Sequence, residues 1–138
     1  MAVDMPRPNI YQERYQVEKF PIQDDVYVEA YWRDDRAGKG PAASVYVHGE
    51  EVLRLDCFDG DQGHFHVNIA TEPARWYYPP APASEHIERA MFDLTRNLQF
   101  CTRRSTDEAV RRTRVNKEEL EAVVPRLRSH MLALAARL

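Results

Sequence analysis

Apolar and polar side chains alternate over four stretches between residues 26 and 69, and this alternation limits the fold more than any other feature of the sequence. Successive side chains of a β-strand point to opposite faces, so a period of two predicts strands with one apolar and one polar face. The stretches cover residues 26–33, 43–48, 53–57 and 64–69. Segments rich in Gly, Asp and Pro separate them, which favours turns and an antiparallel meander.

The alternation also predicts which side chains share a face and which strands pair. The predicted core face contains Val26, Val28, Ala30, Trp32, Ala43, Val45, Val47, Leu53, Leu55, Cys57, Phe65, Val67 and Ile69. The predicted polar face includes Tyr27, Glu29, Tyr31, Arg33, Ser44, Tyr46, His48, Val52, Arg54, Asp56, His64, His66 and Asn68. Opposed residues of an antiparallel ladder share a face, so we expect Asp56 opposite His64 and Arg54 opposite His66. For the same reason we expect Val47 opposite Leu53, across an odd-length loop around Gly49.

Helices are predicted after the sheet. Residues 71–84 contain four prolines and should form a crossover loop. Ser84 then suits an N-cap, opening a helix whose apolar stripe packs on the sheet: Ile87, Met91, Leu94, Leu98 and Cys101. Ser105 or Thr106 should cap a short helix, and Asn116 should cap the last helix, which Pro125 should kink or split.

The pattern therefore predicts one α+β domain over residues 1–138: an antiparallel sheet of about four strands followed by two or three helices. Residues 1–20 could form an arm or an edge strand, residues 26–70 the sheet, 71–84 the crossover and 85–138 the helical part. No apolar run approaches the roughly 20 residues of a membrane span, and the first residues lack the apolar core of a signal peptide. Two cysteines form no disulfide or zinc pattern, so we expect a cytoplasmic protein.

Charge is unevenly distributed along the chain. Residues 103–138 contain 9 Lys and Arg against 5 Asp and Glu, although the whole chain has a net charge of −3. A basic segment suits nucleic acid or an acidic partner chain, but arginine on the solvated face of a helix is the commoner explanation.

The segment from Asp56 to His66 contains the side chains best suited to metal binding or catalysis. One strand places His64 and His66 on the same side, about 7 Å apart. With Asp56 they could bind a divalent metal, or they could act as general acid and base on a phosphodiester while Arg54 stabilises the phosphate. They could also be polar residues of a half-solvated sheet. We expect no tightly bound cofactor, because a structural zinc site has four ligands and only three are evident.

This segment resembles the TumE family, small proteins described as toxins of bacterial toxin–antitoxin pairs. The spacing D-x3-G-x3-H-x-H falls on Asp56, Gly60, His64 and His66, and the similarity extends over about residues 26–100. Gln62-Gly63 and Cys57 depart from residues that are usual in the family. The resemblance implies a toxin-like protein acting on nucleic acid, with an antitoxin-like protein and RNA as partners.

The sequence therefore leaves two alternative hypotheses for the function. The first is a ribonuclease that uses His64, His66, Asp56 and Arg54; the second is a non-catalytic interaction module that forms a homodimer or binds a partner chain. An aromatic cluster at residues 76–78 could stack on a nucleobase or seal the core, and sealing is the expected role.

Overall fold

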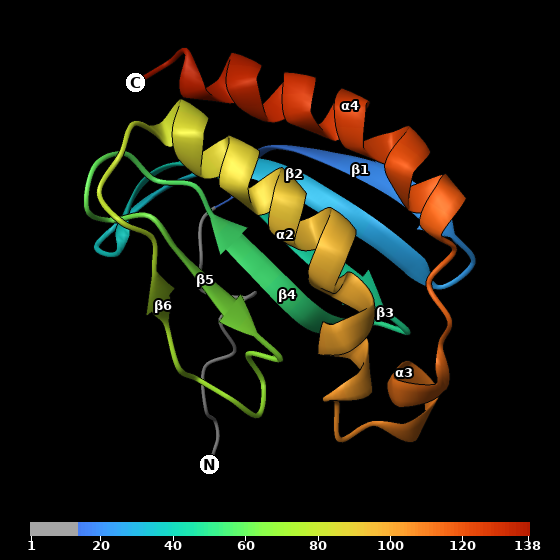
Figure 1. Cartoon of the computed structure of the whole chain (residues 1–138). Helices are drawn as coiled ribbons and strands as arrows, with labels where there is room; N and C mark the ends of the chain where they lie inside the picture. The colour runs from blue at the N-terminus through green and yellow to red at the C-terminus, as the bar shows by residue number, and fades with distance from the viewer. Residues whose placement is uncertain (1–13) are drawn as a thin grey trace.

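The computed structural model describes residues 14–138 as one antiparallel sheet with helices on one of its faces (Figure 1). The strands lie in chain order across the sheet: β1 (Tyr15–Gln23), β2 (Val26–Asp35), β3 (Gly38–Val47), β4 (Glu50–Asp56), β5 (His64–Val67) and β6 (Trp76–Tyr77). Three helices follow within the described residues: α2 (Ala83–Arg103), α3 (Glu108–Arg112) and α4 (Lys117–Ala135). The predicted α+β class and meander topology are confirmed.

Within residues 14–138 the sheet has six strands, where about four were predicted. β1 forms one edge of the sheet within the described residues, so the end of residues 1–20 lies in a strand, while residues 1–13 lie outside the described part. β6 forms the other edge, inside the segment predicted to be only a crossover loop. Two residues in a proline-rich stretch are too few to show an alternation, so β6 leaves no periodic signal.

The core lies between the sheet and the helices α2 and α4. Valine, leucine and alanine side chains of β2, β3 and β4 pack there against the apolar stripes of both helices, including Ile87, Leu94, Leu98, Leu127 and Met131. Burying each large aliphatic side chain stabilises the fold by about 1.5–3 kcal/mol. The face of the sheet that carries these side chains therefore packs against the helices. Within residues 14–138 no helix combines the length and the apolar character needed to cross a membrane.

The hairpin between β3 and β4 differs from the predicted register. Val47 lies opposite Glu50 across a two-residue turn, in which His48 and Gly49 both have positive φ angles of 49° and 79°. Such turns match the twist of the flanking strands. One extra residue, Val52, then forms a β-bulge between the pairs Tyr46–Glu51 and Val45–Leu53.

This bulge changes which side chains of β4 share a face. Val52 was predicted on the polar face but is fully buried in the core. Glu51 and Arg54, three positions apart, would point to opposite faces of a regular strand, yet the bulge brings them to the same face. The polar face therefore gains a carboxylate that simple alternation assigns to the core.

The end of β5 also differs from the prediction. Asn68 has a φ angle of 47°, and its side-chain amide donates a hydrogen bond to the Cys101 carbonyl of α2 at 3.1 Å. Asn68 thus lies on the helix side of the sheet, not on the polar face. Ile69 follows outside the strand and is not part of the main core.

The helix termini were predicted in part. Asn116 caps α4 as expected, since its side chain accepts a hydrogen bond from the Glu119 amide at 3.0 Å. α2 begins at Ala83, not after Ser84, and the Asp59 carboxylate accepts from the Ala83 amide at 2.9 Å. Asp107 caps α3 in place of Ser105 or Thr106. α4 is not split, because it continues through Pro125 to Ala135.

Candidate functional site

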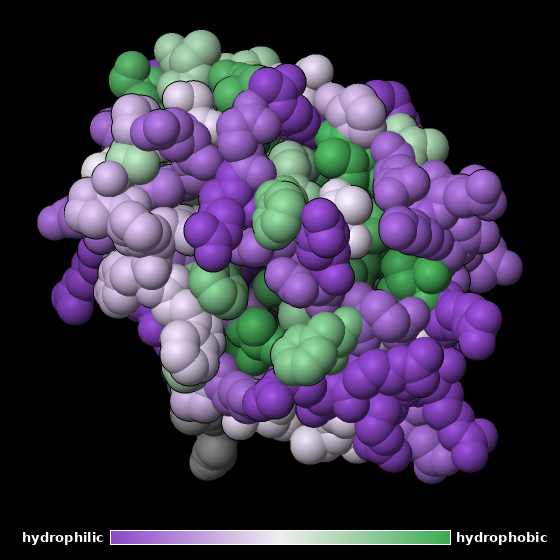
Figure 2. All heavy atoms as spheres, viewed as in Figure 1, coloured by the Kyte–Doolittle hydropathy of each residue, from purple (hydrophilic) through white to green (hydrophobic). Residues whose placement is uncertain are grey.

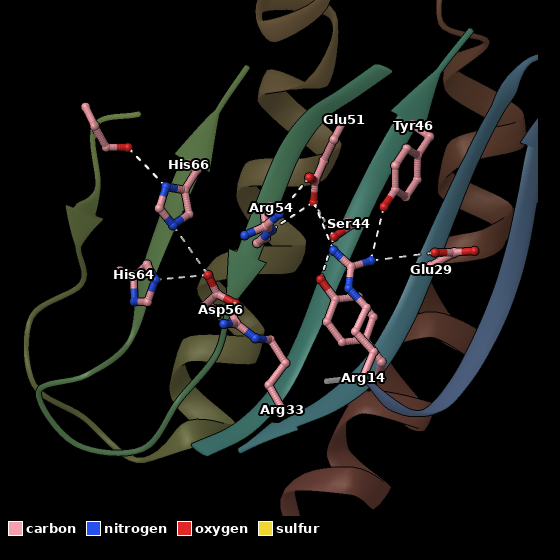
Figure 3. Close-up of polar contacts among 12 residues, drawn as sticks. Arg14, Glu29, Arg33, Ser44, Tyr46, Glu51, Arg54, Asp56, His64 and His66 are labelled. Carbon is pink, nitrogen blue, oxygen red and sulfur yellow. Dashed lines mark hydrogen bonds and ion pairs between the residues drawn. The ribbon is translucent and has the colours of Figure 1, made fainter. Parts of the chain in front are cut away.

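The candidate site lies on the face of the sheet that points away from the helices (Figure 3). β4 and β5 pair so that Asp56 is opposite His64 and Arg54 is opposite His66, which confirms the predicted register. Asp56, His64 and His66 meet there, and we call these three residues the Asp–His–His group.

The three side chains converge closely. The Nε2 atom of His64 lies 2.9 Å from Oδ2 of Asp56, and Nε2 of His66 lies 3.6 Å from the same oxygen. Each of the three residues offers one possible metal-ligand atom, a ring nitrogen or a carboxylate oxygen, and these three atoms all lie within 4.8 Å of one another. All three residues are buried, with at most 5% of any of them exposed. A half-solvated face was one expectation for these residues, and this part of the face does not meet it.

Both histidine rings are held by main-chain oxygens. Nδ1 of His64 lies 2.8 Å from the Gln62 carbonyl, and Nδ1 of His66 lies 3.2 Å from the Ala74 carbonyl. A carbonyl oxygen can only accept, so each Nδ1 carries the proton and donates it. The rings are therefore oriented with both Nε2 atoms toward Asp56.

Arg33 of β2 binds the other oxygen of Asp56. Its Nη1 donates to Oδ1 at 3.0 Å, and both side chains are buried. Burial alone would raise the pKa of Asp56, but the contact with His64 and the charge of Arg33 outweigh it and lower that pKa below its usual value. Asp56 is thus a carboxylate at neutral pH. Burial lowers the pKa of His66 to about 4, which makes its ring neutral.

Arg54 lies on the same face as the Asp–His–His group, opposite His66, and its main contact there is with Glu51. Its guanidinium forms a bidentate pair with Glu51, with distances of 2.8 Å from Nε and 2.7 Å from Nη2. Ser44 donates to the same carboxylate at 2.6 Å and also contacts the Tyr31 hydroxyl at 2.5 Å. We call Glu51, Arg54, Ser44 and Tyr31 the buried Glu–Arg network. The charge of Arg54 is thus neutralised by Glu51. Its predicted role toward a phosphate stays a prediction.

Arg14 adds a further cation to this face. It donates to the Tyr46 hydroxyl at 3.1 Å, lies 3.7 Å from carboxylate oxygens of Glu29 and Glu51, and covers the Tyr31 ring. Arg14, Arg33 and Glu51 were not among the predicted site residues. Arg33 could have been found, because alternation already placed it on the polar face of residues 26–33.

Exposed side chains border the group at the sheet edge. β6 places Tyr77 opposite His64, with 5.6 Å between the ring centroids, and 60% of Tyr77 is exposed. The Arg75 guanidinium donates to the Tyr77 hydroxyl at 3.4 Å. The predicted sealing role holds for Tyr78, which is buried and stacks on His86, but not for the exposed Trp76 and Tyr77.

Comparisons with protein-family models, with curated proteins and with solved structures found no match to this chain. The geometry of the polar face and the chemistry of its side chains are therefore the basis for assigning a function.

Proposed function

We propose that this protein is a toxin-like enzyme that cleaves phosphodiester bonds in RNA at the Asp–His–His group. The observation that carries the proposal is the neighbourhood of that group: an exposed tyrosine, Tyr77, lies against the His64 ring, and an exposed arginine, Arg75, donates to the hydroxyl of that tyrosine. An exposed aromatic ring can stack on a nucleobase, and a guanidinium can bind the adjoining phosphate.

The group contains the side chains that such a cleavage needs. Neutral His66 can accept the proton of an attacking hydroxyl. His64 can serve as the acid only when a second proton on Nε2 makes it an imidazolium beside Asp56, and that proton then goes to the leaving oxygen. A metal-activated water is the alternative route to the same product. Because the group is buried, either route requires the surface beside Tyr77 to open before a phosphodiester can reach it.

Induced expression in a bacterial host tests the proposal. The wild-type chain should stop growth, and the double variant His64→Ala, His66→Ala should relieve the arrest at equal protein level. His48→Asn is a matched control, because His48 is exposed in a turn, far from the group in the ladder, and asparagine tolerates its positive φ.

The purified proteins should differ in the same way in their cleavage of single-stranded RNA. Wild type and His48→Asn should cleave it, and the double variant should not. Folded wild-type protein that neither arrests growth nor cleaves RNA would remove the proposed enzyme.

A non-catalytic interaction module is the second candidate, favoured by one observation on α2. Phe92 and Phe100 are more than half exposed, and Arg96 and Arg104 lie over their rings. The helix face of the molecule shows separate hydrophobic patches among hydrophilic residues (Figure 2). If this face pairs two copies or binds a partner chain, Phe92→Ser with Phe100→Ser should shift the mass measured by light scattering toward the monomer. A non-catalytic module should also leave RNA uncleaved, which separates it from the enzyme.

A further inference from the structure

We infer that the Asp–His–His group is a binding site for a divalent first-row metal ion, with zinc as the best-fitting cation. This inference goes beyond phosphodiester cleavage and does not depend on it. It starts from the hydrogen-bond donors and acceptors of three buried side chains, and from the carbonyl oxygens that orient two of them.

Two buried atoms at the centre of the group have no hydrogen-bond partner among residues 14–138. His64 uses the proton on Nδ1 for the Gln62 carbonyl, so its Nε2 presents a lone pair toward Asp56. Nε2 of His64 and Oδ2 of Asp56 are buried and 2.9 Å apart, yet neither atom makes a regular hydrogen bond with any residue of the chain that the structure describes. Two facing lone pairs repel each other, and leaving them buried and unpaired is costly.

A positive charge between these atoms removes the conflict. A proton shared by His64 and Asp56 would form a hydrogen bond between those two residues. It would not explain why Nε2 of His66 also faces the same oxygen, at 3.6 Å. A divalent cation accepts electron density from all three atoms at once. The set of two imidazoles and one carboxylate is a common one for zinc and for iron(II).

The distances suit an ion of this size. The three candidate ligand atoms lie within 4.8 Å of one another. Zinc bonds of about 2.0–2.2 Å to nitrogen and oxygen require ligand atoms roughly 3–4 Å apart, so only small side-chain movements are needed. Magnesium and calcium prefer oxygen ligands, and two imidazoles therefore select against them.

The surroundings resemble the outer shell of a metal centre. Metal-binding histidines usually donate their second ring N–H to a carbonyl or carboxylate, and here the Gln62 and Ala74 carbonyls fill that role. Arg33 binds Oδ1 of Asp56, which leaves Oδ2 as the ligand atom. Three protein ligands leave one position of a tetrahedral ion for water or substrate, as in catalytic zinc sites.

Metal titration of the full chain tests this site. Protein stripped with a chelator should bind one zinc per chain by calorimetry, and cobalt(II) at the same site should give the visible absorption of a four-coordinate ion. His66→Asn and His64→Asn should each weaken zinc binding at least tenfold, whereas His48→Asn should bind as wild type does. Circular dichroism will confirm that each variant is folded, and the cobalt spectrum of wild type gives a readout that needs no variant.

Two results would overturn the inference: folded wild type that binds no zinc or cobalt at 100-fold molar excess, or His64→Asn and His66→Asn variants that bind zinc with wild-type affinity. Failure of the metal site can be distinguished from failure of the enzyme. Stoichiometric zinc without RNA cleavage supports the site and removes the proposed enzyme; RNA cleavage by protein that binds no metal keeps the enzyme and removes the site.

Discussion

Along β4, from Glu51 to Asp56, both faces of the sheet are buried, but different interactions hold them. Leu55 of β4 points to the helices and is surrounded by aliphatic side chains, while its neighbour Arg54 points the other way and is only 2% exposed. Arg54 is stable there because Glu51 neutralises its charge and binds two of its nitrogens. Apolar packing is not directional, so a side chain of the apolar face can be replaced by another of similar size. A buried charge of the polar face needs a specific partner of opposite charge.

Arg54→Ala is expected to have the largest effect on stability. It removes the bidentate partner of the buried Glu51 carboxylate and leaves only Arg14, at 3.7 Å, as a nearby cation; breaking a buried pair in this way costs about 3–5 kcal/mol. Urea denaturation should measure that loss in the free energy of unfolding. The double change Glu51→Leu, Arg54→Met should recover most of it, and a loss below about 1 kcal/mol for Arg54→Ala would show that the pair is not buried in solution.

Leu55→Ala gives the matching value for the apolar face. Truncating a fully buried leucine removes transfer free energy and leaves a cavity, with a cost of about 2–5 kcal/mol. The same urea titration applies. Leu55→Met, which nearly conserves volume, should cost less than about 1.5 kcal/mol, and an equal cost for both variants would argue against close packing at this position.

Tyr31→Phe separates neutral from ionic contacts within the polar face. It removes the hydroxyl that contacts Ser44 at 2.5 Å but leaves Ser44 bonded to Glu51. A neutral buried hydrogen bond contributes about 0.5–1.5 kcal/mol, so the loss should be well below that of Arg54→Ala. Thermal unfolding with a calorimeter should resolve the two; equal losses would mean that the tyrosine hydroxyl supports the charges of the whole network.

Arg128→Ala should have the smallest effect, although it breaks a pair of the same chemistry. Arg128 binds Glu88 through two nitrogens, but both side chains are exposed and solvent screens their charges. The hydrogen bond from Arg128 lowers the pKa of Glu88 in the folded protein. The pair therefore stabilises the fold at pH values above the usual glutamate pKa, and this stabilisation is lost as the pH falls through the lowered pKa of Glu88. The difference in melting temperature between wild type and Arg128→Ala should therefore vanish in 1 M salt and at acid pH; a difference that persists in both would contradict screening.

The sequence predicted the side of the sheet on which each residue lies better than it predicted burial. Alternation is a property of the strand itself, so β2 and the pairing of β4 with β5 could be predicted from residues alone. Alternation says nothing about what covers a face, and the burial of His64 and Asp56 could not be foreseen. Glu51 was missed because the bulge shifts the phase of β4, and its only trace in the sequence is the adjacent apolar pair Val52-Leu53.

The bulge at Val52 also has a consequence for how this chain can vary in length. If Val52 were deleted, Glu51 would be followed directly by Leu53, and the ladder with Tyr46 and Val45 would continue without interruption. Glu51 and Arg54 would still share a face, now as ordinary alternate residues of a strand. Deletion of Val52 would therefore remove one buried core side chain and shorten the hairpin by one residue, while every ionic side chain of β4 would keep its direction.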